Sequence, residues 1–129
     1  MGRLTRGKSV LKKLAKFGFA ALAIATISAC YTVPKERDFT LDLQGDYKAV
    51  ADCAWMTFRT KSDWSRDNLD SMSKVEFSFG NTSATAGRID IVGVSPNRTQ
   101  IRSYMPVAAW GKNFWPDKHR PIFEACGSK

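Results

Sequence analysis

The chain has 129 residues, of which 20 are basic and 12 acidic, and its net charge at pH 7 is +8. Six of the basic residues lie within the first 16 positions, where there is no acidic residue, so the rest of the chain has 14 basic residues against 12 acidic ones. Such a balance does not give the positive field that nucleic-acid binding needs, and we expect no nucleic-acid partner.

The first 29 residues are organised as an export signal. A basic stretch ends at Lys16 and is followed by an apolar stretch over 17–29, which suits a signal peptide but is shorter than the roughly 20 residues of a transmembrane helix. Residues 27–30, Ile-Ser-Ala-Cys, resemble the lipobox of bacterial lipoproteins. The resemblance covers residues 1–30 and implies cleavage before Cys30 and acylation of that cysteine. The alternatives are an ordinary secretory signal with a free Cys30 thiol, and a permanent transmembrane anchor.

The count of cysteines agrees with this interpretation. There are three, and an odd number in an exported protein calls for an explanation. If Cys30 becomes a thioether, Cys53 and Cys126 remain as an even pair in an oxidising compartment, where disulfides persist. We therefore predict a disulfide between Cys53 and Cys126.

Three parts of the chain are predicted: a signal peptide over 1–29, an acylated N-terminus and tether over 30–38, and a single domain over 39–129. The tether prediction rests on the proline and alternating charges within 31–38. The lipoprotein resemblance implies a lipid anchor in the bacterial cell envelope. It favours the outer membrane over the inner one, because the residue after the cysteine is Tyr31 and not the aspartate that retains some lipoproteins at the inner membrane.

The first half of the domain predicts one strand and one helix. Residues 39–43 alternate apolar and polar, which indicates a short edge strand. Asp46 is a candidate cap for an amphipathic helix over 46–58. Its apolar stripe consists of Tyr47, Val50, Ala51, Ala54 and Phe58. Residues 59–73 are rich in Asp, Ser and Asn, and we expect a loop there.

The second half predicts a meander followed by short pieces. Strands are expected over 74–79, 84–94 and 99–105, with one face in contact with water. Prolines then divide the tail, so that one brief helix should end before Pro116 and another should begin at Pro121. The predicted fold class is α+β: a small two-layer domain with a three- to four-stranded antiparallel sheet, packed by the amphipathic helix and short C-terminal helical segments.

Residues that could perform catalysis are scarce. His119 is the only histidine, and one histidine cannot complete a zinc site or pair with a cysteine nucleophile if both remaining cysteines are bridged. There is no Gly-x-Ser-x-Gly sequence, which would mark a hydrolase serine. We expect no metal, no cofactor and no catalytic residue, and we predict that the protein is not an enzyme.

The four tryptophans are more informative about function. Trp64 lies in the predicted loop, and Trp110, Phe114 and Trp115 cluster in the tail. Aromatic side chains often anchor protein interfaces, so these four residues are a candidate interface for an envelope protein, with core packing as the alternative. The predicted function is a lipid-anchored binding or accessory module of the cell envelope. One alternative is a periplasmic inhibitor of a hydrolase, with 59–73 or 115–121 as its protruding loop, and the other is an enzyme with a cleft.

Overall fold

A computed structural model of the chain describes residues 33–81 and 84–128. The predicted signal peptide and Cys30 lie outside the described residues. In chain order the elements are β1 (Phe39–Gln44), α2 (Tyr47–Phe58), β2 (Trp64–Leu69), the 3-10 turn η2 (Asp70–Met72), β3 (Lys74–Asn81), β4 (Ala84–Ser95), β5 (Arg98–Tyr104) and α3 (Phe114–Glu124).

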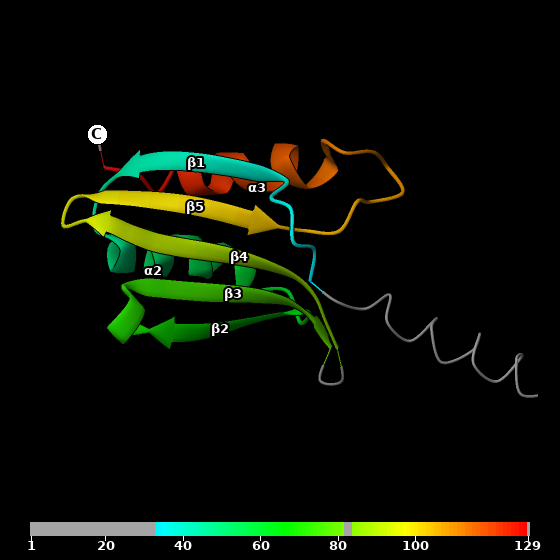
Figure 1. Ribbon diagram of the computed structural model, residues 1–129, viewed down its shortest axis with the longest axis horizontal. Helices are drawn as coiled ribbons and strands as arrows, with labels where there is room; N and C mark the ends of the chain where they lie inside the picture. The colour runs from blue at the N-terminus through cyan, green and yellow to red at the C-terminus, as the bar shows by residue number, and fades with distance from the viewer. Residues whose placement is uncertain (1–32, 82–83, 129) are drawn as a thin grey trace, which may run out of the picture. The chain divides into compact units, whose positions relative to one another are not determined.

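The five strands form one antiparallel sheet in the order β1-β5-β4-β3-β2. Strands β2 to β5 are a meander, and β1 pairs with the last strand of that meander (Figure 1). The predicted α+β class is confirmed. The sheet differs from the prediction in having five strands and not three or four.

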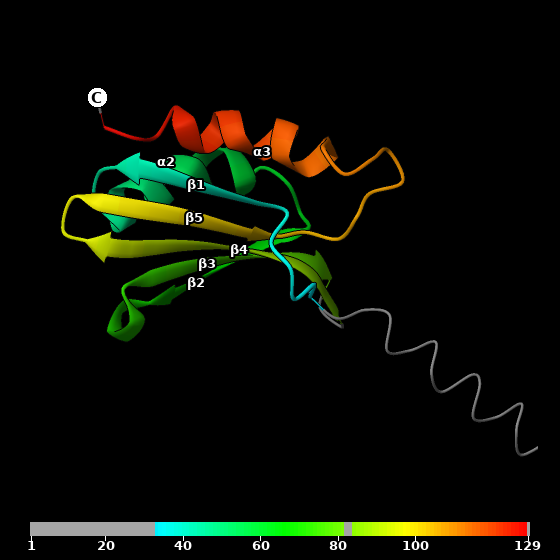
Figure 2. The same cartoon turned by 45° about the horizontal axis from the view of Figure 1, so that its top comes forward.

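Both helices pack on the same face of the sheet (Figure 2). Because side chains alternate between the two faces of a strand, the apolar residues of the meander line one side. Phe77 is opposite Ile89, and Ile91 is opposite Ile101, and all four are fully buried beneath the helices. The opposite face carries Lys74, Glu76, Arg88, Arg102 and other polar residues.

Helix α2 begins where the sequence predicts. The Asp46 carboxylate accepts hydrogen bonds from the backbone amides of Lys48 and Ala49, at 3.1 and 3.2 Å, which satisfies two donors of the first turn. The buried side of the helix consists of Val50, Ala51, Ala54 and Phe58, which are members of the predicted stripe.

The segment predicted as a loop over 59–73 contains strand β2, so that prediction was wrong. Strand β2 is the edge strand next to β3. Its pairing with β3 holds these residues as a strand, although their polar sequence does not indicate one. Arg66 points from this edge toward the helix layer, where its guanidinium lies 2.7 Å from the carboxylate of Asp52 on α2. An inward-pointing charge of this kind is one way to prevent an open sheet edge from pairing with a strand of another chain.

The tail forms one continuous helix, which corrects the prediction of two short helical segments separated at Pro116 and Pro121. Pro116 lies in the first turn of α3, where an amide has no partner within the helix to lose. Pro121 lies inside the helix. The helix nevertheless continues, because His119 and Phe123 on its inner side are fully buried and because Cys126, just beyond its end, is bonded to α2.

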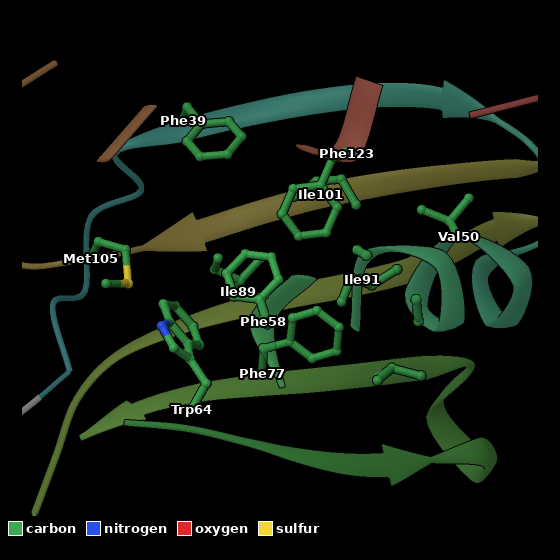
Figure 3. Close-up of a cluster of buried hydrophobic side chains, with 13 residues drawn as sticks. Phe39, Val50, Phe58, Trp64, Phe77, Ile89, Ile91, Ile101, Met105 and Phe123 are labelled. Carbon is green, nitrogen blue, oxygen red and sulfur yellow. The ribbon is translucent and has the colours of Figure 1, made fainter. Parts of the chain in front are cut away.

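The core is centred on Phe58, at the end of α2. Its ring lies 4.7 Å from Trp64, 5.2 Å from Phe77 and 5.7 Å from Phe123, measured between ring centroids. Figure 3 shows these side chains meeting between the sheet and the helices. The predicted disulfide is present: Cys53 on α2 is bonded to Cys126, with Cα atoms 5.7 Å apart. The bond ties α2 to the segment that follows α3.

Replacing Cys53 and Cys126 by alanine should lower the free energy of unfolding by about 4 kcal/mol, because the bond closes a loop between residues 73 positions apart and restricts the unfolded chain. Urea unfolding of the exported protein measures this. Adding a reductant should lower the free energy of unfolding of the unaltered protein to that of the variant, and it should not change that of the variant. A loss smaller than about 1 kcal/mol would show that the disulfide adds little to the packing of the helices.

Candidate functional site

A chain of aromatic contacts runs from the core to the surface through α3. Phe58 contacts the His119 ring at 5.2 Å, and His119 stacks on Trp115 at 5.2 Å. Trp115 contacts Phe114 at 4.8 Å, and Phe114 contacts Trp110 at 4.8 Å. The outermost ring of this chain is therefore held in place by rings that are packed in the core.

The outer end of the chain lies in the connection between β5 and α3, and we call Val107, Trp110 and Phe114 the apolar tip. Val107 is 85% exposed and Trp110 is 76% exposed, whereas Phe114 is half-buried. A tight turn brings these side chains outward: the amide of Gly111 donates to the carbonyl of Ala108 at 3.0 Å. Gly111 has a φ of 110°, a conformation that glycine adopts without strain.

Basic side chains accompany the tip. The ammonium group of Lys118 on α3 lies 5.4 Å from the centre of the Phe114 ring and 5.7 Å from that of Trp115. Lys112 is exposed on the connection itself, and one acidic residue, Asp117, is exposed on the first turns of α3. The tip thus combines exposed apolar groups with cationic groups at their margin.

The four residues predicted as an interface do not form one surface. Trp64 is only 8% exposed and packs against Phe58, as Figure 3 shows, so its prediction as an exposed loop residue was wrong. Trp115 is half-buried and lies 5.4 Å from Phe79 of β3. Trp110 and Phe114 remain candidates for an interface. Val107 completes the tip; the signal for it in the sequence is the stretch 105–111, which contains no polar side chain.

A cleft with a volume of about 570 Å³ lies beside Val107 of the tip. One wall is the N-terminal arm, residues 34–38, and the other consists of Met105, Pro106, Val107, Lys112, Asn113 and Trp115. The arm is fixed there by backbone bonding, because the amide of Asp38 donates to the carbonyl of Ser103 at 2.9 Å and the amide of Met105 donates to the Asp38 carboxylate at 3.2 Å.

His119 is fully buried, and neither ring nitrogen has a hydrogen-bond partner among the described residues. Burial, together with the nearby positive charges of Lys61 and Lys118, lowers its pKa to about 4. A neutral imidazole enclosed by Phe58, Trp64 and Trp115 has no access to a substrate in this arrangement. We therefore assign it to the core and not to catalysis.

The sheet face opposite the helices holds one carboxyl group in an unusual environment. Asp90 is only 5% exposed there, with Arg88 at 2.9 Å and Lys74 at 3.8 Å. Burial raises the pKa of Asp90, and the attraction of the two cations opposes that rise only in part. Lys74 also pairs with Glu76 at 3.3 Å, so the face is a set of mutually paired charges.

Within residues 33–81 and 84–128, no group of three or more His, Cys, Asp or Glu side chains could hold a metal ion. None of the helices in the same residues is both long and apolar enough to cross a membrane. Comparisons of the chain with known protein families, with curated proteins and with solved structures find no match.

Replacing Trp115 by alanine should lower the free energy of unfolding by about 2 kcal/mol, because its half-buried ring packs against Phe79 and His119. The matched change of Trp110 should cost less than about 0.5 kcal/mol, since that side chain is largely exposed. Chemical denaturation of the two variants compares them directly. Equal losses would place Trp110 in the folded core and contradict its assignment to the tip.

Acid should destabilise the protein through His119. Its pKa is about 4 in the folded chain and about 6.5 in the unfolded chain. Above pH 6.5 both states hold the neutral ring, so no stability is lost. Between pH 6.5 and 4 only the unfolded chain gains the proton, so stability falls, and by pH 4 the loss approaches about 3 kcal/mol.

The variant His119→Phe should lack this loss. The difference in unfolding free energy between the two proteins, followed by urea denaturation from pH 7.5 to pH 4, should therefore change in favour of the variant as the pH falls. The raised pKa of Asp90 acts in the opposite direction but is common to both proteins, so it cancels in the difference. Identical pH profiles would contradict the assignment of a buried, neutral His119.

Proposed function

We propose that this chain is a lipid-anchored binding or accessory module of the bacterial cell envelope, without catalytic activity of its own. The observation that carries the proposal is the apolar tip: Trp110 is 76% exposed and its ring contacts that of Phe114. Exposed aromatic side chains are typical of binding surfaces, both for proteins and for the membrane–water interface. The contact of Phe114 with Trp115, which stacks on His119, holds the tip in shape before any partner arrives, and preorganisation lowers the entropy lost on binding.

The absence of catalysis is proposed from the environments of the ionisable groups. A catalytic acid or base needs a pKa near the working pH and access to the substrate. His119 is enclosed by aromatic rings, and its pKa lies near 4. Asp90, the carboxyl group whose pKa is raised, is covered by its neighbours on a sheet face and is paired with Arg88 and Lys74.

The alternative of a hydrolase inhibitor loses its proposed reactive loops. Residues 59–73 include strand β2, and residues 115–121 lie within α3. Regular structure therefore occupies the middle of the first segment and the whole of the second, and neither is the long irregular loop that an inhibitor would insert into an active site. A binding module is therefore the better proposal.

The anchor is proposed from the sequence of the first 30 residues. With acyl chains on Cys30, the domain would stay at the membrane, because two or more chains hold a protein stably. We propose the outer membrane as its site and an envelope protein as its partner.

The proposal is tested by isolating the full chain, tagged at its C-terminus, from crosslinked native membranes. We expect the mature protein to carry acyl chains on Cys30 by mass measurement and to bring one envelope protein with it. The matched variant Cys30→Ser should leave an uncut or soluble precursor that recovers no such protein. An unmodified Cys30 thiol in the mature protein overturns the anchor, and recovery no greater than that of the variant overturns the partner.

A further inference from the structure

We propose that the apolar tip inserts into the lipid–water interface of the membrane that carries the anchor, so that the domain is held to the bilayer at two points. The inference rests on the lipid anchor of the proposed function and names what the tip contacts. The envelope protein would then meet the domain on its other surfaces.

The N-terminal arm and the β5–α3 connection, which carries the tip, lie at one end of the domain in the two views (Figures 1 and 2). Residues 34–38 of the arm and Val107 of the tip line the same cleft. The arm is held at its last residues, because the backbone of Asp38 is bonded to Ser103, its carboxylate accepts from the amide of Met105, and Arg37 donates to the hydroxyl of Tyr104. The chain before the arm therefore leaves the domain at this end.

Cys30 lies close in sequence to the cleft. Three residues separate it from Pro34, which lines the cleft, and a fully extended chain covers about 14 Å over the four steps between their Cα atoms. A lipid on Cys30 would hold Pro34 within that distance of the bilayer surface. Val107 lines the same cleft, so the tip would be held close to the headgroups at a high effective concentration.

The exposed side chains of the tip suit the membrane–water interface. Tryptophan is enriched at the membrane–water interface, where its amphipathic ring suits the headgroup region. Trp110 and Val107 are the two most exposed large apolar side chains among the described residues. Lys112 and Lys118 at the margin of the tip would lie near anionic headgroups, which attract basic residues.

The size of the tip favours lipid over protein as the occupant. A stable protein interface buries about 800 Å² on each partner, with its aromatic anchors surrounded by further contacts. The other exposed large apolar residues, Met56, Met72 and Val94, lie on α2, η2 and β4 and do not extend the tip. A small protrusion suffices for a bilayer surface when a lipid anchor already supplies most of the attachment.

The test uses the full chain, acylated in a bacterium and reconstituted in vesicles of phosphatidylethanolamine and phosphatidylglycerol. A nitroxide label is placed at Val107→Cys, and a matched label at Met72→Cys in η2, at the other end of the sheet (Figure 1). Peptide mapping verifies that the disulfide between Cys53 and Cys126 is retained. The readout is the collision rate of each label with oxygen, which enriches in lipid, relative to a water-soluble nickel complex.

On reconstitution, the oxygen-to-nickel ratio should rise severalfold at position 107 and stay at its value in water at position 72. Adding Trp110→Ala to the Val107→Cys protein should return the ratio toward its value in water, because the second inserted group is lost. This change lies outside the buried core, so it should not unfold the domain.

The other outcomes separate the inference from the function on which it depends. If the protein floats with the vesicles and Cys30 is acylated, but the label at 107 stays in water, the inference is overturned and the anchor stands. If position 107 is shielded in native membranes and not in vesicles, a protein occupies the tip and the inference is again wrong. If Cys30 is unmodified and the protein does not float, the anchor and the inference fall together.

Discussion

The packing of both helices on one face of the sheet is the constraint on which the rest of the domain depends. Phe58 lies at the centre of that layer, in contact with Trp64 from the sheet edge and with Phe123 and His119 from α3. The Cys53–Cys126 bond then holds α2 against the end of α3. Because α3 is fixed along its length, the first turn of the helix provides a stable base for the β5–α3 connection.

The elements that were predicted correctly follow from short-range sequence patterns. Asp46 caps α2 because a carboxylate before an apolar stripe satisfies free amides whatever surrounds it. The alternation around Phe77 and Ile89 likewise assigns a buried face without knowledge of neighbours. Strand β2 and the continuous helix α3 could not be predicted without knowing which elements they pack against. The edge strand is ordered by pairing with β3, the next strand along the chain. Helix α3 continues through Pro121 because its inner face is buried against residues far away in sequence, such as Phe58.

Only part of the candidate site could be predicted, because short-range sequence patterns do not show which distant residues come together. The clustering of aromatic residues indicated Trp110 and Phe114, of which Trp110 is largely exposed and Phe114 is half-buried. Trp64 was misassigned because its polar neighbours in sequence hid a core position. That residues 34–38 lie across a cleft from Val107 depends on β1 pairing with β5, and no local pattern encodes a pairing between the first and last strands.

The position of Arg66 affects how copies of the domain would behave if many of them were anchored on one membrane surface. Chains tethered in one membrane share an orientation, so their sheet edges lie at the same height and meet often. An open strand edge at that height would template the joining of neighbours into a continuous ribbon. Arg66 turns its charge inward to Asp52 from the edge strand β2, and at the opposite edge the amide of Ser128 donates to the carbonyl of Gln44 at the end of β1. The inward charge makes the β2 edge a poor template, and the bond from Ser128 occupies one carbonyl of the β1 edge. If the chain is anchored as proposed, many copies could then share one membrane surface and still remain separate molecules.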